Sequence, residues 1–210
     1  MTAPPTPSHP ITPRFESALA YAIDHHRGDI RKGTQIPYAA HLLAVAAIVM
    51  EMEGTEDEAI AALLHDVVED GGGPPAAEEI RARFGSSVAA MVLANSDSTS
   101  GSRDKAPWRE RKESYLAGIA TKPIGAVRVS IADKLHNARA ILRDYERIGD
   151  ALWARFSVGG AETLWYYGSL VSAFESRRPE LGPGGEAALD DLARVVTDLS
   201  ATATSAAPRG

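Results

Sequence analysis

The segment ALLHDVVED, residues 62–70, places four ionisable side chains in a stretch that is otherwise apolar. Residues four apart share one face of an α-helix, so Glu69 is expected over His65 and Asp70 over Asp66. Burying such groups in a helix is unfavourable unless an opposite charge compensates them, and a bound cation meets that requirement. The segment therefore predicts a metal site inside a helical protein.

The rest of the chain carries helical periodicity and capping signals, and no segment shows a convincing strand pattern. Thr12 and Pro13 predict one helix start, and the capping-box pair Thr55 and Glu58 predicts the start of the helix that holds His65. That helix is expected to run to the glycines at 71–73. Further helices are expected near residues 37–53, 75–84, 87–94, 108–120, 124–143, 151–156, 161–175 and 185–199, with a polar loop at 96–107. The predicted fold class is all-α, a single-domain helical bundle.

Composition narrows the possible functions of the 210-residue chain. Its 44% apolar and 24% charged residues are ordinary for a globular protein. The absence of cysteine excludes disulfides and thiolate metal sites, and the net charge of −6 argues against a broad nucleic-acid surface. No apolar run approaches the roughly 20 residues of a membrane helix, and no signal-peptide pattern is present. We therefore expect a cytoplasmic protein with no membrane and no nucleic-acid partner.

The two ends of the chain are rich in small and polar residues and proline, which favours disorder. We expect a disordered tail at 1–12, one helical domain at 13–180, a C-terminal helix at 181–199 and a disordered tail at 200–210. The proline- and glycine-rich link RRPELGPGG precedes that last helix, which is consistent with loose docking. The sequence leaves the oligomeric state open.

Two further segments carry side chains of the same chemical kind as residues 65 and 66. His41 lies in RKGTQIPYAAHLLAV, and Asp133 lies in the apolar run of VSIADKLHNARAIL. With His65 and Asp66 they form an imidazole–carboxylate set that suits Mn²⁺, Fe²⁺ or Zn²⁺ better than Ca²⁺. An isolated His41 is more often a core histidine, and Asp133 alone could pair with Lys134. The metal hypothesis therefore depends on the three segments converging.

The order of these segments carries a family resemblance. RKG-x-x-x-PY-x-x-H is followed by LLHDVVED, then by FG, and then by ADKLHNAR. This pattern resembles the HD-domain metal-dependent phosphohydrolases, and among them the hydrolase domain of the RelA/SpoT superfamily. The resemblance runs over residues 15–143. It implies an HD-type helical bundle that acts as a small alarmone hydrolase, removing the 3′-pyrophosphate of (p)ppGpp to give GDP or GTP and pyrophosphate.

The resemblance also implies roles for individual residues. The metal ligands, with Mn²⁺ as the implied cofactor, fall on His41, His65, Asp66 and Asp133, the catalytic acidic pair on Glu69 and Asp70, and the substrate pocket on Arg31, Lys32 and Asn137. The sequence departs from the family where Gly71 and Ala140 each stand in place of a common threonine. These departures leave the preference for guanine, and for ppGpp over pppGpp, open.

The same residues suit the chemistry of phosphoric anhydride hydrolysis. A divalent metal activates water and polarises a phosphoryl oxygen, while the two acids orient that water and the basic pair balances phosphate charge. Two alternatives stay open: the same site acting on NADPH or a nucleoside monophosphate, and a nucleotide-binding module without turnover. His136 is interpreted as a structural or supporting residue. An RK pair such as Arg31 and Lys32 is also common on ordinary surfaces.

Overall fold

The computed structural model of the protein describes residues 10–96 and 106–206. Their α-helices are α1 (Pro13–His25), α2 (Ala39–Glu51), α3 (Glu56–Leu64), α4 (Gly73–Phe84), α5 (Ser86–Asn95), α6 (Trp108–Gly118), α7 (Ile124–Ile148), α8 (Gly160–Glu175) and α9 (Arg178–Ala206). Short turns of other helix types are η1 (Val68–Gly72), η2 (Ile119–Thr121) and η3 (Gly149–Arg155). Ile30 and Pro37 form an isolated bridge, and no β-strand forms in the described part of the chain. The predicted all-α class is confirmed.

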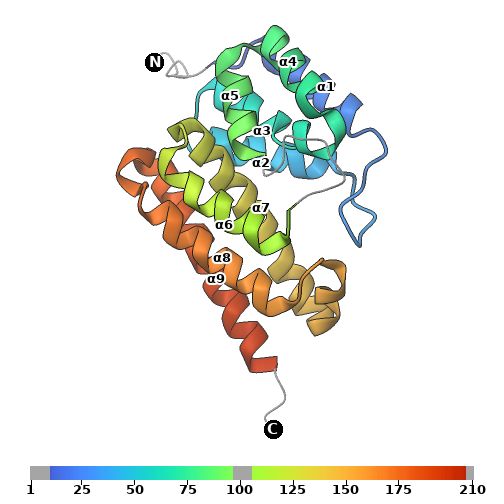
Figure 1. Cartoon of the computed structure of the whole chain (residues 1–210), viewed down its shortest axis with the longest axis vertical. Coiled ribbons are helices and arrows are strands. Elements are labelled where there is room, and N and C mark those ends of the chain that lie inside the picture. The colour runs from blue at the N-terminus through green and yellow to red at the C-terminus, as the bar shows by residue number, and fades with distance from the viewer. Residues whose placement is uncertain (1–9, 97–105, 207–210) are drawn as a thin grey trace, which may run out of the picture.

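The long helix α7 is the centre of the bundle (Figure 1). It packs against α2, α3 and α5 and, most extensively, against α9. Side chains such as Leu64, Ile131, Leu135, Phe174 and Leu189 are completely or almost completely buried between these helices. Because α2, α3 and α7 touch one another, polar residues on their facing sides are brought together in the interior.

The two predicted helix starts are present. The Thr12 hydroxyl accepts a hydrogen bond from the Arg14 backbone amide at the start of α1. At the start of α3 the Thr55 hydroxyl accepts a hydrogen bond from the Glu58 backbone amide. The Glu58 carboxylate accepts one from the Thr55 backbone amide, which completes a capping box. Caps of this kind typically stabilise a helix by about 1 kcal/mol.

The predicted helix over residues 55–70 is wrong in its second half, because α3 ends at Leu64. The Nδ1 atom of His65 lies 2.8 Å from the Ala62 carbonyl oxygen. In a continuing α-helix, that carbonyl oxygen would accept a hydrogen bond from the Asp66 backbone amide. A tighter turn follows, with the Val67 amide donating to the Leu64 carbonyl, and then the π-helical turn η1. Within this irregular stretch the Asp70 amide still donates to the Asp66 carbonyl oxygen, at 2.9 Å.

The C-terminal helix is longer and more firmly docked than predicted. It begins at Arg178, bends at Gly182 and continues to Ala206, so the predicted disorder is wrong for residues 200–206. The Thr202 and Thr204 hydroxyls donate to carbonyl oxygens one turn earlier, at 2.8 Å each, and alanine favours helix. Leu181 and Leu199 are buried, which contradicts loose docking. Predicted disorder at 1–9 and 207–210, and most of the predicted loop 96–107, fall outside the described residues.

Candidate metal centre

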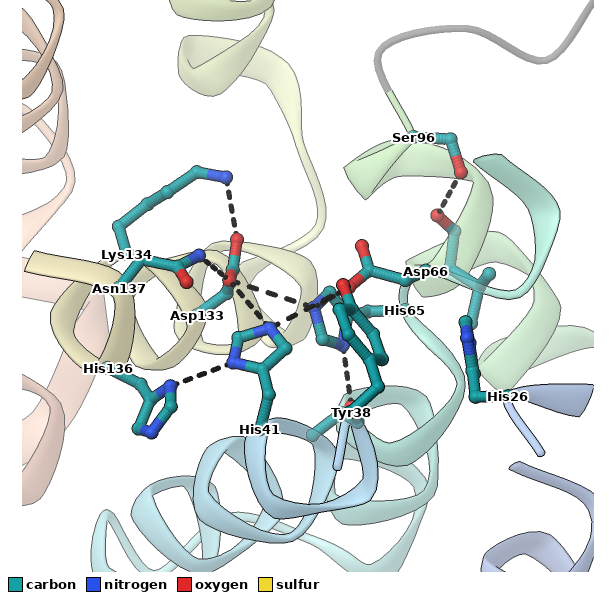
Figure 2. Close-up of polar contacts among 12 residues, drawn as sticks. His26, Tyr38, His41, His65, Asp66, Ser96, Asp133, Lys134, His136 and Asn137 are labelled. Carbon is teal, nitrogen blue, oxygen red and sulfur yellow. Dashed lines mark hydrogen bonds and ion pairs between the residues drawn. The ribbon is translucent and has the colours of Figure 1, made fainter. Parts of the chain in front are cut away.

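Three helices direct the predicted metal ligands to one point (Figure 2). His41 projects from the first turns of α2, His65 and Asp66 follow the end of α3, and Asp133 lies at the middle of α7. His41, His65 and Asp133 are buried, and Asp66 is partly buried. The early end of α3 is what lets two consecutive residues, His65 and Asp66, approach the same point.

The distances between ligand atoms are those of a compact cluster. Nε2 of His41 lies 3.3 Å from Oδ1 of Asp133 and 3.7 Å from Oδ2 of Asp66. Nε2 of His65 lies 3.0 Å from Oδ2 of Asp66 and 3.7 Å from Oδ1 of Asp133. One ligand atom each from His41, His65 and Asp133 fall within 4.8 Å of one another. All four predicted ligands are therefore brought together.

Supporting contacts fix the orientation of each ligand. The His65 Nδ1 atom donates to the Ala62 carbonyl oxygen, so Nε2 is the ring nitrogen that faces the cluster. The Tyr38 hydroxyl donates to Oδ2 of Asp66. On α7, the Lys134 ammonium donates to Oδ2 of Asp133 at 2.6 Å. These contacts leave the acceptor atoms of the cluster pointing at a common centre.

The acid–base behaviour of the cluster reflects burial opposed by close charges. Burial alone would raise the pKa of Asp133, but the adjacent Lys134 ammonium and the two imidazoles hold it well below its usual range. Burial likewise opposes ionisation of Asp66, yet His65 keeps the pKa of Asp66 below its usual range. Burial lowers the pKa of His41. Both carboxylates are therefore charged at neutral pH, as metal ligands must be.

The donor set fits a divalent metal. Within the described residues, the Nε2 atom of His65 is buried and makes no hydrogen bond, although a carboxylate oxygen faces it. Such an atom is normally satisfied in a folded protein, and a metal ion at the cluster centre would satisfy it. Two imidazoles with carboxylate oxygens match the ligand preference of Mn²⁺, Fe²⁺ and Zn²⁺. The residues present therefore fit the metal that the sequence implies.

A wide cavity of about 600 Å³ opens on the His41 side of the cluster, a volume typical of small-molecule sites. Its wall includes all three predicted substrate residues, Arg31, Lys32 and Asn137, together with Tyr38, His136, Ala140, Arg143, Arg155 and Tyr167. Arg31 donates to the Asn137 side-chain oxygen at 2.6 Å, and Asn137 donates to Oδ1 of Asp133 at 2.5 Å. A chain of hydrogen bonds thus joins the cavity wall to the metal cluster.

The predicted acidic pair is divided by the structure. Glu69 lines a small polar pocket together with His65, Asp66, Asp133 and Lys134, on a different side of the cluster from the wide cavity. Asp70 is exposed and does not line that pocket. Neighbouring residues point about 100° apart around a helical turn, so Glu69 lines the small pocket while Asp70 faces outward.

Several supporting residues were not assigned such roles from the sequence. Lys134, Tyr115 and Tyr166 line the small pocket, and the Tyr115 and Ser130 hydroxyl oxygens lie 2.5 Å apart in its wall. In the sequence, the ion pair between Lys134 and Asp133 is indicated only by the fact that the two residues are adjacent. Nothing in the sequence pattern points to Tyr115, which reaches the pocket from α6.

Comparison with known proteins agrees with this geometry. The HD domain family matches residues 18–158. A guanosine-3′,5′-bis(diphosphate) 3′-pyrophosphohydrolase of Haemophilus influenzae is 35% identical over 126 residues, which cover 57% of this chain and 17% of that protein. A protein of the same activity name from Drosophila melanogaster is 34% identical over 129 residues, covering 60% of this chain and 68% of the fly protein. The chain thus spans about a sixth of the bacterial relative.

Solved structures show the same fold. The crystal structure of lmo0812 from Listeria monocytogenes EGD-e has a TM-score of 0.64 and 28% identity, covering 75% of this chain and 96% of that one. A metazoan orthologue of SpoT, reported to hydrolyse ppGpp, has a TM-score of 0.67 at 24% identity and covers 89% and 97% of the two chains. The family match includes all four predicted metal ligands. The chain therefore belongs to the HD-domain family and is homologous to (p)ppGpp 3′-pyrophosphohydrolases.

Proposed function

We propose that the protein is an Mn²⁺-dependent hydrolase that removes the 3′-pyrophosphate of (p)ppGpp. The observation that carries the proposal is the position of the acidic and imidazole cluster between a nucleotide-sized cavity and a small pocket that holds Glu69. The names of the homologues add the substrate class. His41, His65, Asp66 and Asp133 would hold the metal, which supplies an activated water and withdraws charge from a phosphoryl oxygen.

The residues around the cluster suit the remaining tasks. Arg31 lies on the cavity wall and, as a guanidinium, can bind a phosphate through two parallel hydrogen bonds. Glu69, on the wall of the small pocket, would orient a water and take its proton as the water oxygen bonds to phosphorus. The bond from phosphorus to the ribose 3′ oxygen breaks, and that oxygen gains a proton. The products are GDP or GTP and pyrophosphate.

One residue on the wall of the wide cavity favours testing other nucleotides as substrates. Ala140 lines the wide cavity, at a position where the resemblance to the family implies a threonine. A lost hydroxyl removes one polar contact to a nucleotide, which widens the range of acceptable bases. NADPH and nucleoside monophosphates are therefore the alternative substrates to compare.

The test is release of pyrophosphate and GDP from ppGpp by the purified protein. It is run with Mn²⁺ and with chelator, beside NADPH and nucleoside monophosphates. Metal-dependent turnover of ppGpp alone is the expected result. Turnover of another nucleotide would keep the metal site and change the substrate. No turnover of any of them by metal-loaded protein would favour a nucleotide-binding module.

A further inference from the structure

A separate cavity of about 320 Å³ lies beside the small pocket, between the end of α5 and helix α6. Its wall includes Ser96, Arg111, Ser114, Tyr115 and Lys122. Tyr115 also lines the small pocket, so its ring is a wall that the two spaces share. None of the predicted site residues lines this cavity.

Lys122 is the unusual member of this wall. Its Nζ atom is buried and makes no hydrogen bond in the described part of the chain, and it lies 3.4 Å from the centre of the Tyr115 ring. A buried ammonium without a hydrogen-bonding partner is unfavourable, and contact with a ring face compensates only part of that cost. A group of this kind indicates a place where a charged ligand binds.

The charges that face Lys122 explain its acid–base state. Burial first, and then repulsion from Lys134, lower the pKa of Lys122 to about 7. Among the residues that the structure describes, the other charged side chains on the cavity wall are Arg111 and Glu110. An added negative charge would therefore be attracted to this cavity and would favour the protonated amine.

We propose that this cavity is an anion site that binds phosphate or pyrophosphate, with Lys122 as its principal charge partner. The lysine side chain has a flexible four-carbon stem, so Nζ can turn from the Tyr115 ring toward the adjoining space. The Arg111 guanidinium and the Ser114 hydroxyl on the same wall are donors suited to phosphate oxygens. The cavity volume accommodates either anion.

Calorimetry with inorganic phosphate and with pyrophosphate tests the site directly. The protein is kept in chelator at pH 8, where a pKa of about 7 leaves Lys122 roughly nine-tenths neutral. Titrations in two buffers of different ionisation enthalpy then measure proton uptake. The expected result is binding of at least one anion with a net proton uptake that Lys122→Arg does not show, because the bound anion reprotonates Lys122. The preferred anion identifies the natural ligand as free phosphate or as the pyrophosphate of the proposed reaction.

Matched variants separate this cavity from the nucleotide cavity. Lys122→Met is expected to weaken anion binding at least tenfold, whereas Lys122→Arg retains binding without proton uptake. Gly118→Leu puts an apolar side chain on the cavity wall and keeps the lysine, and a Cβ at Gly118 meets no atom within 4 Å. It should also weaken binding. Arg31→Met, in the wide cavity, should leave the Lys122-dependent binding step, marked by its proton uptake, unchanged.

Three results would overturn the proposal. The first is equal anion affinity in wild type and Lys122→Met, and the second is loss of binding in Arg31→Met but not in Gly118→Leu. The third is no heat of binding with either anion. Melting temperatures of all variants show whether each remains folded, so that a loss of binding reports on the cavity.

Discussion

The Nδ1 atoms of His41 and His136 lie 2.8 Å apart, which joins a predicted metal ligand on α2 to a neighbour of Asp133 on α7. Burial, followed by the charges of His41 and Arg31, lowers the pKa of His136 to about 4, so His136 is neutral near pH 7. A neutral His136 can accept a hydrogen bond from Nδ1 of His41. In that tautomer Nε2 of His41 faces the cluster as a lone pair.

His136→Leu is therefore expected to weaken metal binding by roughly 10- to 100-fold, as loss of such supporting partners typically does. His136→Asn should retain part of the affinity, because its side-chain oxygen can accept the same hydrogen bond. Calorimetric titration with Mn²⁺ measures both variants, with circular dichroism to check the fold. Wild-type affinity in His136→Leu would show that the histidine contact does not orient the ligand.

Metal binding should stabilise the protein through the cluster. Mn²⁺ at 100 times its Kd is expected to add about 2.7 kcal/mol to the free energy of unfolding, because the ion binds only the folded chain. The melting temperature of wild type should rise with Mn²⁺ and return with chelator. Asp133→Asn, which removes one charged ligand, should show little of this rise. A similar metal-dependent rise in Asp133→Asn would argue against Asp133 as a ligand.

The two predicted acids should differ in their effect on turnover. Glu69 lines the small pocket beside the ligands, whereas Asp70 is exposed. Glu69→Gln is expected to lower kcat about 100-fold or more, the usual loss when a general base is removed, with little change in KM. Asp70→Asn should lower kcat less. Steady-state kinetics on ppGpp with measured metal content decide the point, and equal losses would contradict the division that the structure shows.

Replacing the buried Lys122 amine should stabilise the fold in a pH-dependent way. Its folded pKa of about 7 lies below the ordinary value of 10.5, so the folded state binds this proton more weakly than the unfolded chain does. The penalty is complete below pH 7 and disappears as pH rises from 7 to about 10.5. Lys122→Met should therefore raise the free energy of unfolding by about 2–4 kcal/mol at pH 6 and by much less at pH 10. Urea unfolding at the two pH values measures this difference.

The control for that experiment is Lys32→Met, at an exposed lysine. It should change the free energy of unfolding by less than about 0.5 kcal/mol at either pH. A gain for Lys122→Met that is equal at pH 6 and pH 10 would mean that side-chain packing, and not the amine charge, sets its stability.

A close backbone contact should make substitution of Gly184, in the last helix, destabilising. A Cβ at Gly184 would lie 2.8 Å from backbone atoms of Met52, at the end of α2. Gly184→Ala should lower the free energy of unfolding by about 1–3 kcal/mol, as overpacking does. Gly168→Ala on α8 is the matched control, because its Cβ would meet no atom within 4 Å and alanine favours helix. Thermal unfolding compares the two, and equal effects would show that α9 can move away from Met52.

Local sequence determined most of the helical architecture. Thr12 with Pro13, and Thr55 with Glu58, define helix starts through contacts between near neighbours, so these starts are readable from the sequence. The end of α3 was not readable, because it depends on how the His65 side chain contacts Ala62 in the folded chain. The extension of α9 to Ala206 was missed because a polar, alanine-rich composition is compatible with disorder or with helix, and packing against α7 and α8 decides between them.

For the candidate site too, some features could be predicted from the sequence and others only from the structure. The sequence by itself identified His41, His65, Asp66 and Asp133 as a set, because a buried carboxylate or imidazole in an apolar helix needs a partner wherever the chain folds. Only the tertiary structure shows that Glu69 lines the small pocket and Asp70 does not. It also shows that His136 contacts His41, and that the Lys122 amine is buried beside the Tyr115 ring. These relationships join residues from different helices. They depend on how the helices pack, and no local spacing encodes the distance between side chains that meet only in the folded bundle.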